Sequence, residues 1–249
     1  MLRKVLVALF LSVGLMAGEV SLAVAANMTD AIEVLKKAFM QTHPDIKVSS
    51  VLGSSGKLSA QIIAGAPYDI FLSANMKFPQ NLYADGVAVS KPIVYASGAL
   101  AMMSTKGFDL NRGISVINDA KVEKISLANP KTAPYGTATV EAFKSAGLYE
   151  KVESKLVYAE SISQAVQFAT TAADIGFVNM SAFYSPKMKA YVKGKDWVAV
   201  DTKLYTPIAQ GMVILKKGEN NADAKAFYDF LSSAEAKSIF RDFGYVVNE

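Results

Sequence analysis

Residues 46–73, which read IKVSSVLGSSGKLSAQIIAGAPYDIFLS, contain the pattern that decides the fold. The apolar run at 46–52 predicts a strand, and the small residues 53–56 predict a tight connection after it. The apolar spacing of 57–64 predicts a helix, and the run at 68–73 predicts a second strand. A strand, a helix and a strand in this order form a parallel βαβ unit, so the sequence predicts an α/β fold.

The same alternation continues on both sides of this unit. Before it, residues 20–25 predict a strand, and a helix follows with Ala31, Leu35, Ala38 and Phe39 on one face. The elements predicted after it are a helix that ends at 85–86, strands at 124–128, 155–159, 174–178 and 208–215, and helices that begin near 137, 163, 221 and 234.

Two extended stretches, 93–104 and 206–215, are typical of crossings between lobes. A chain that leaves one α/β lobe, builds another and returns needs two such crossings. We therefore predict two lobes, each a mostly parallel sheet with flanking helices. Lobe 1 would comprise 18–96 and 206–249, and lobe 2 would be inserted at 97–205. Closure of the cleft around a ligand is the motion expected of two lobes joined by a double hinge.

The N-terminus has the composition of a secretory signal peptide. Arg3 and Lys4 precede an apolar run at 5–16, which is shorter than the roughly 20 residues that span a bilayer. We predict a cleavable signal peptide at 1–17 and export to the periplasm. A second possible cleavage motif at 23–25 is less favourable, because cleavage there would remove most of the first predicted strand.

Composition excludes several kinds of site and partner. The formal net charge of the 249 residues is +4, and losing Arg3 and Lys4 lowers it to +2, so we expect no nucleic-acid partner. The chain has no cysteine, which excludes disulfides, thiolate metal sites and lipid attachment at a cysteine. The single histidine, His43, excludes a His-rich metal site and is interpreted as a helix-end residue. We expect a monomer that diffuses freely, with no cofactor and no bound metal cation.

Four predicted strand-to-helix junctions consist of small or amide side chains. In an open α/β sheet such junctions lie at the carboxyl ends of the strands, where ligands bind. Each also begins a helix, so free backbone N–H groups and the positive end of a helix dipole point outward. One such loop is an ordinary N-cap, but four of them, two from each lobe, predict an anion site. The junctions are 26–29, 53–56, 133–137 and 160–163.

The four loops have only neutral donors, since Lys57 and Lys131 merely flank them. Hydrogen bonds to a charged group contribute roughly 1.5–3 kcal/mol each, so about six or seven can hold a dianion at micromolar affinity, about −8 kcal/mol. Phosphate retains a proton part of the time near neutral pH and would need a buried acceptor carboxylate. Asp30 and Glu160 are the only candidates, and both fit better at helix starts. Loop chemistry alone therefore predicts a fully deprotonated oxyanion.

Several segments together resemble the periplasmic molybdate-binding proteins of ABC transporters, and the resemblance covers about 19–245. It implies a type II periplasmic-binding fold that binds molybdate or tungstate without catalysis and delivers it to an inner-membrane ABC permease. The two anions are nearly isosteric, so the sequence does not separate them. The segments that carry the resemblance are 52–56, 64–74, 128–136, 174–178 and 226–231.

The resemblance also implies roles for individual residues of lobe 1. Ser55 would donate its hydroxyl and backbone N–H to the anion, with Ser54 beside it. In the first loop this chain has Asn27 where the better-known branch of the family has serine. A second branch has asparagine there, which implies that Asn27 donates through its amide, with Ala26 adjacent.

In lobe 2 the resemblance implies donation from backbone groups. Tyr135 and Ile162 would each donate a backbone N–H, and the Tyr135 hydroxyl is a further candidate. Asn179 stands where the better-known branch has tyrosine, so it would either line the pocket or end a strand.

Two alternatives remain open. Another oxyanion, such as sulfate or phosphate, would fit the same loops, and pocket size would decide between them. A secreted serine hydrolase is a remote alternative, because residues 53–56 do not form G-x-S-x-G. His43, just upstream of the preceding strand, is also badly placed for a Ser–His pair. Ferric iron would need several tyrosines and carboxylates, whereas the loops contain one tyrosine.

Overall fold

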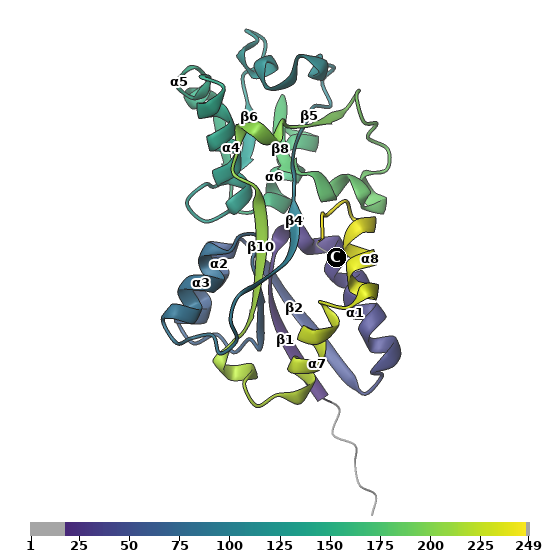
Figure 1. The fold of residues 1–249 in the computed structure, drawn as a ribbon. Coiled ribbons are helices and arrows are strands. Elements are labelled where there is room, and N and C mark those ends of the chain that lie inside the picture. Colours follow the sequence, from purple (N-terminus) through teal and green to yellow (C-terminus); the bar gives the residue numbers. More distant parts are fainter. Residues whose placement is uncertain (1–17, 248–249) are drawn as a thin grey trace, which may run out of the picture.

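The computed structural model describes residues 18–247, so the predicted signal peptide at 1–17 lies outside the described residues. Two lobes lie one above the other, and each is built on a five-stranded sheet (Figure 1). The beginning and end of the described chain share the lower lobe, lobe 1, and the middle of the chain forms lobe 2. None of the helices within 18–247 is long and apolar enough to cross a membrane.

The sheet of lobe 1 has the strand order β2-β1-β3-β10-β4. Its strands are β1 Gly18–Ala25, β2 Ile46–Gly53, β3 Ile70–Leu72, β4 Ile93–Gly98 and β10 Ile208–Ile214. β1 pairs in parallel with β2 along its whole length and with β3 on its other side. The predicted strand at 20–25 is therefore confirmed as an inner strand of the sheet.

Helices cover both faces of this sheet because successive side chains of each strand point to opposite sides. Leu22 and Val24 of β1 belong to the same apolar core as α1, α7 and α8, whereas Ala23 packs with α2 on the other face. On the predicted face of α1, Leu35 and Phe39 are buried. The helices of lobe 1 are α1 Thr29–Thr42, α2 Ser55–Ile63, α3 Lys77–Ala84, α7 Ala222–Phe230 and α8 Ala234–Asp242.

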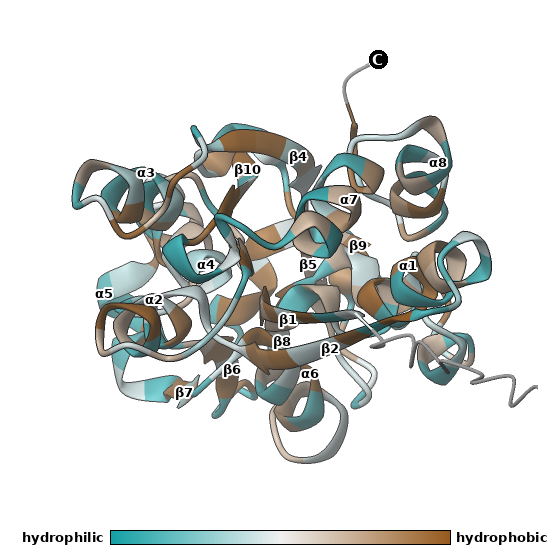
Figure 2. Cartoon of the chain, turned by 90° about the horizontal axis from the view of Figure 1, so that it is seen from below, coloured by the Kyte–Doolittle hydropathy of each residue, from teal (hydrophilic) through white to brown (hydrophobic). Residues whose placement is uncertain are grey.

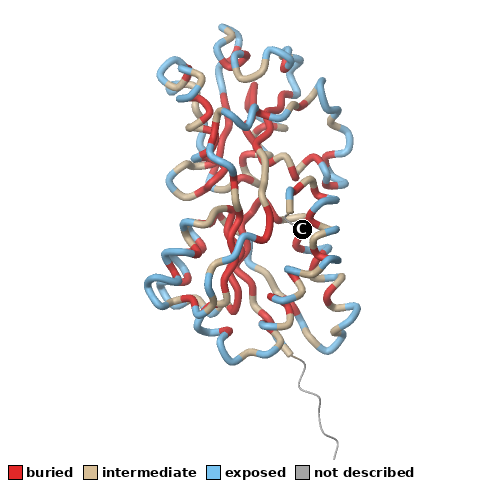
Figure 3. The backbone as a smooth tube through the Cα atoms, viewed as in Figure 1, coloured by how far each residue is buried: buried red, intermediate tan, exposed pale blue. Residues whose placement is uncertain are grey.

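The sheet of lobe 2 has the order β7-β6-β8-β5-β9. Its strands are β5 Leu100–Met103, β6 Ile125–Ala128, β7 Leu156–Ala159, β8 Ile175–Asn179 and β9 Trp197–Ala199. Its helices are α4 Pro134–Ser145, α5 Tyr149–Val152 and α6 Ile162–Thr171. In both lobes the inner strands are hydrophobic and buried, the edge strands are partly exposed, and the outer helices carry hydrophilic, exposed residues (Figures 2 and 3).

In each sheet, one strand is antiparallel to both of its neighbours. β10 is antiparallel to β3 and β4, and β5 is antiparallel to β8 and β9. Each reversed strand is the one that the chain forms on arriving from the other lobe. The other strands of both sheets end at the cleft, so a chain that crosses the cleft enters the next sheet in the opposite direction.

The chain changes sheets twice, between Gly98 and Leu100 and between Ala199 and Ile208. Both crossings fall in or beside the extended stretches expected from the sequence. The lobe boundaries at 96/97 and 205/206 stay a prediction. The two crossings place the carboxyl ends of the parallel strands of both lobes at the same cleft.

Candidate functional site

Four strand-to-helix junctions, two from each lobe, meet at one small cavity. The cavity has a volume of ≈ 10 Å³ accessible to water, and among residues 18–247 no charged side chain lines it. Six of the seven sequence-predicted site residues line this cavity, and Asn179 does not. The lining residues are Ala25, Ala26, Asn27, Gly53, Ser54, Ser55, Ala74, Ala133, Pro134, Tyr135 and Ile162.

In lobe 1 the start of α2 provides hydroxyl and backbone donors. Ser55 is the first residue of the helix, and its Oγ accepts a hydrogen bond from the Ala74 N–H at 2.9 Å. Because that bond occupies only a lone pair, the Ser55 O–H is free to donate. The Oγ of Ser54 is buried without a hydrogen-bond partner among the described residues. The first intrahelical bond runs from Leu58 N to Ser54 O, so the N–H of Ser55 has no partner within the helix.

In lobe 2 the starts of α4 and α6 provide backbone donors. Pro134 has no N–H, and the first intrahelical bond of α4 comes from Thr137, which leaves the N–H of Tyr135 free of the helix. In α6, the Ser161 side chain caps the N–H of Gln164, and the N–H of Ile162 precedes the first intrahelical bond. A search for polar side chains could not find Ile162, because only its backbone is polar.

The side-chain nitrogen of Asn27 points toward Gln210 on β10 and Tyr245 near the C-terminal end of the described chain. Its Nδ2 donates to Gln210 Oε1 at 2.8 Å and to Tyr245 Oη at 3.0 Å. Its Oδ1 is buried and has no partner among the described residues. In this orientation the Asn27 amide presents no free N–H, so donation by that amide to an anion stays a prediction.

The Tyr135 hydroxyl also lies next to Gln210. Gln210 Nε2 donates to it at 3.5 Å, and the ring is buried. Burial raises the pKa of the Tyr135 hydroxyl well above its usual value, and burial raises the pKa of Tyr245 to about 12. Both hydroxyls are therefore neutral near pH 7 and place no negative charge beside the cavity.

Asn179 links the lobes beside the small cavity. It is the last residue of β8, and its Nδ2 donates to the backbone oxygen of Asn27 at 3.3 Å and to Ser181 Oγ at 2.7 Å. Of the two roles considered for it, the structure shows the strand end, together with a contact across the cleft. Asn179 lines the larger neighbouring cavity and not the small one.

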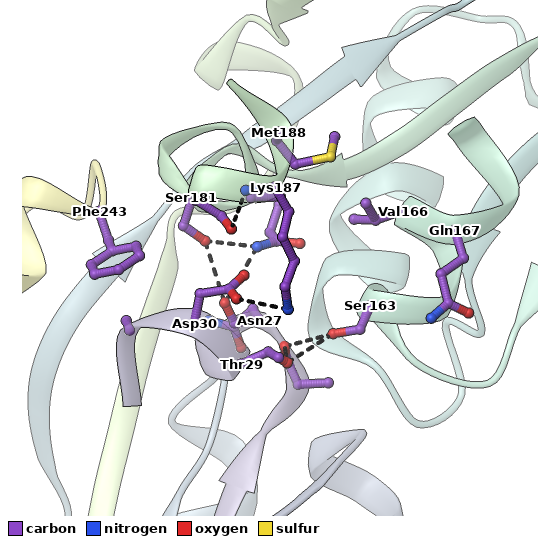
Figure 4. Close-up of a pocket in the computed structure, with 15 residues that line it drawn as sticks. Asn27, Thr29, Asp30, Ser163, Val166, Gln167, Ser181, Lys187, Met188 and Phe243 are labelled. Carbon is purple, nitrogen blue, oxygen red and sulfur yellow. Dashed lines mark hydrogen bonds and ion pairs between the residues drawn. The ribbon is translucent and has the colours of Figure 1, made fainter. Parts of the chain in front are cut away.

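That larger cavity, of ≈ 180 Å³, lies between the start of α1 and lobe 2 (Figure 4). Its polar side chains bond to one another across the cleft. Thr29 Oγ1 lies 3.0 Å from Ser163 Oγ, and Lys187 Nζ lies 3.4 Å from Asp30 Oδ1. Because these groups satisfy each other, the smaller cavity with its unpaired donors is the better candidate for an anion site.

The lobes are in contact around the small cavity. The Gly56 N–H donates to the Thr132 backbone oxygen at 2.8 Å, and Lys57 forms an ion pair with Glu160. Asp30 lies in the first turn of α1, as the sequence indicates. Neither Asp30 nor Glu160 lines the small cavity, so no carboxylate is available there to accept a proton from a ligand.

His43 lies far from these donors. It follows the last residue of α1 and stacks on Phe39, with ring centroids 4.2 Å apart, which confirms the helix-end interpretation. The whole of β2, about 25 Å long at 3.3 Å per residue, separates it from Ser55. Within 18–247, no group of three or more His, Asp or Glu residues is placed to hold a metal ion.

We expect His43→Ala to leave oxyanion affinity unchanged, because the ring stacks on Phe39 and bonds to Thr42 and Phe39 at the end of α1, far from the cavity. Calorimetric titration of the variant against the unaltered protein checks this. A loss of affinity would place His43 in the anion site, whereas the loss of a hydrolytic activity would revive the serine hydrolase alternative.

Comparisons with known proteins agree with this geometry. The family model described as "Bacterial extracellular solute-binding protein" matches residues 20–246. The molybdate-binding protein ModA of Rhodobacter capsulatus is 39% identical, over 92% of this chain and 89% of the relative. ModA of Azotobacter vinelandii is 38% identical, over 92% and 90%.

A solved structure shares the fold. The periplasmic molybdate-binding protein of Azotobacter vinelandii superposes with a TM-score of 0.84 at 31% identity, covering 92% of this chain and 100% of that chain. This match confirms the predicted two-lobed α/β fold.

Proposed function

This chain belongs to the family of bacterial extracellular solute-binding proteins, and we propose that it captures molybdate in the small cavity between its lobes. One observation carries the proposal: four helix starts from two lobes line one cavity with neutral groups only. Two relatives that are 38–39% identical to this chain bear the name molybdate-binding protein.

The cavity would hold the anion by hydrogen bonds alone. Lobe 1 would contribute the Ser55 hydroxyl and N–H together with the Ser54 hydroxyl. Lobe 2 would contribute the N–H groups of Tyr135 and Ile162. Because the donors come from both lobes, an anion that contacts all of them stabilises the closed arrangement over any open one. Each hydrogen bond to a charged group contributes roughly 1.5–3 kcal/mol, which suffices for micromolar or tighter binding.

Molybdate fits this donor set better than phosphate does, because no carboxylate lines the cavity to accept a proton. Tungstate, which carries the same charge and nearly the same shape, is proposed as a second ligand. Sulfate is equally deprotonated but smaller, and it remains the alternative that pocket size decides.

We further propose that the protein is exported by its signal peptide and works in the periplasm as a monomer. It would deliver the anion to an inner-membrane ABC permease. The absence of cysteine from the sequence is consistent with a protein that carries no lipid anchor. No catalysis, cofactor or nucleic acid is part of this proposal, and the separation of His43 from Ser55 supports a binding protein over a serine hydrolase.

Calorimetric titration of the protein without residues 1–17 tests the function. We expect molybdate and tungstate to bind with micromolar or tighter affinity, sulfate more weakly, and phosphate not measurably. Binding of phosphate alone would contradict the proposal, as would the absence of binding by all four anions.

A further inference from the structure

Gln210 joins two of the proposed ligand-binding residues at the hinge. It is fully buried on β10, the strand that the chain forms after its second crossing. Its Oε1 accepts from Asn27 Nδ2 and from the Tyr95 hydroxyl, both at 2.8 Å, and its Nε2 donates to the Tyr135 hydroxyl at 3.5 Å. Asn27 comes from lobe 1 and Tyr135 from lobe 2, so one side chain contacts the binding loops of both lobes.

Two groups of this network lack a partner. Asn27 is only 6% exposed, and its Oδ1 accepts no hydrogen bond from residues 18–247. The Tyr135 hydroxyl accepts from Gln210, but within 18–247 its own proton has no acceptor at hydrogen-bond distance. Buried polar groups are destabilising when they are left unpaired, so both point to a second arrangement of the same side chains.

A half-turn of both carboxamides would satisfy Asn27 Oδ1 and the Tyr135 proton. The Tyr245 hydroxyl, which donates to Asn27 O at 2.9 Å and lies 3.0 Å from the Asn27 side chain, would turn its proton to Oδ1, and Asn179 Nδ2 would still donate to Asn27 O. A carboxamide has nearly the same shape after its oxygen and nitrogen exchange places. After the exchange, Gln210 Nε2 would donate to Asn27 Oδ1 and to the Tyr95 oxygen, and Gln210 Oε1 would accept from the Tyr135 hydroxyl. The Tyr95 hydroxyl would then donate to Ser73 O, which already lies 3.4 Å away.

We propose that this turned arrangement is the anion-bound state and that Gln210 is the positioning residue that holds Asn27 with its Nδ2 toward the anion. The inference rests on the proposed function. In the turned arrangement Asn27 presents a donor, which a fully deprotonated anion accepts. In the other arrangement it presents Oδ1, an acceptor that would suit the proton of hydrogen phosphate. Gln210 would therefore set the selectivity between the two kinds of anion.

The hinge strand β4 leaves room for this contact at Gly98. A Cβ at position 98 would overlap the Tyr135 hydroxyl and would lie 2.7 Å from Gln210 Nε2. Burial raises the pKa values of Tyr95 and Tyr135 well above the usual value, so both hydroxyls keep the proton that the turned arrangement requires. Gly98 and the two neutral tyrosines are consistent with a hydrogen-bond network centred on Gln210.

Two variants and one control test the inference. Gln210→Met removes the carboxamide at similar length, and Tyr135→Phe removes the hydroxyl but keeps the backbone N–H. We expect each to lower molybdate affinity about tenfold, the loss of one hydrogen bond to a charged group. We also expect the ratio of phosphate to molybdate affinity to rise in Gln210→Met. Without the Gln210 carboxamide, Asn27 could present either Nδ2 or Oδ1 to the anion. Tyr228→Phe, a buried tyrosine of α7 outside the network, should change neither quantity.

Nitrogen-15 NMR of the unaltered protein gives a second readout that does not depend on a variant folding. The side-chain NH₂ signals of Asn27 and Gln210, assigned by their loss in Asn27→Ser and Gln210→Met, should both shift when molybdate saturates the protein. Unmoved signals in a protein that binds molybdate would overturn the inference, as would unchanged affinity and selectivity in folded Gln210→Met and Tyr135→Phe. Those results would leave the proposed function intact. Failure of the unaltered protein to bind any of the four anions would overturn the proposed function and this inference with it.

Discussion

Replacing Gly136 by alanine is expected to lower molybdate affinity at least 100-fold, a change of about 2.7 kcal/mol or more. Gly136 follows Tyr135 in the first turn of α4. A Cβ there would overlap the backbone oxygen of Ala128 and would lie 2.9 Å from the backbone nitrogen of Pro130. Backbone atoms at the end of β6 cannot yield as a flexible side chain would, so the start of α4 must move. The Tyr135 N–H would leave the cavity with it.

Calorimetry with molybdate measures the loss, and Gly107→Ala is a matched control in the same lobe. Gly107 has a positive φ of 75° with nothing within 4 Å of its Cβ position, so alanine there costs stability without touching the site. We expect the control to melt at a lower temperature and to keep its affinity. Equal affinity in Gly136→Ala and the unaltered protein would show that the start of α4 does not bind the anion.

The second large effect is expected from Ser55→Ala, which should weaken molybdate binding by roughly 1.5–3 kcal/mol, about 10- to 150-fold. The Ser55 Oγ already accepts from the Ala74 N–H, so its own proton is directed to another acceptor. In the closed cavity the anion would be that acceptor. The substitution removes a donor to a charged group and also leaves the Ala74 N–H without its partner.

Ser59→Ala is the control for this variant, because Ser59 is a buried serine on the same helix that does not line the cavity. Titration with molybdate should distinguish the two variants, with affinity kept only in Ser59→Ala. A Ser55→Ala protein that folds and binds as tightly as the unaltered protein would remove Ser55 from the site.

Much of the fold could be predicted from periodicity, because β1, β2 and α1 carry their own apolar patterns. β9 could not, since Trp197–Ala199 is three residues long and its partner β5 is almost a hundred residues away. The short 3₁₀ helices at Met180–Tyr184 and Pro186–Met188 could not be predicted, for a similar reason. Their hydrophobic side chains pack with β5 and β8, a contact that no local pattern encodes.

The candidate site could likewise be predicted only in part from the sequence. Residues that act through their position at a helix start, such as Ser55 and Tyr135, could be located because strand and helix signals fix where each loop lies. The orientation of side chains could not be predicted. The sequence predicts that Asn27 donates to the anion, but it does not predict that the Asn27 nitrogen contacts Gln210, a residue 183 positions away on β10. Gln210 itself lies within an apolar strand pattern, so nothing in its local sequence marks it.

A crystal structure of the protein grown with tungstate would show where the anion binds, because the heavy atom can be located by anomalous scattering. We expect a single strong tungsten site in the small cavity. Its oxygens should lie within hydrogen-bond distance of Ser55 Oγ and of the backbone nitrogens of Tyr135 and Ile162. A tungsten atom in the larger cavity beside Asp30 and Lys187, or none between the lobes in a protein that binds the anion in solution, would contradict it.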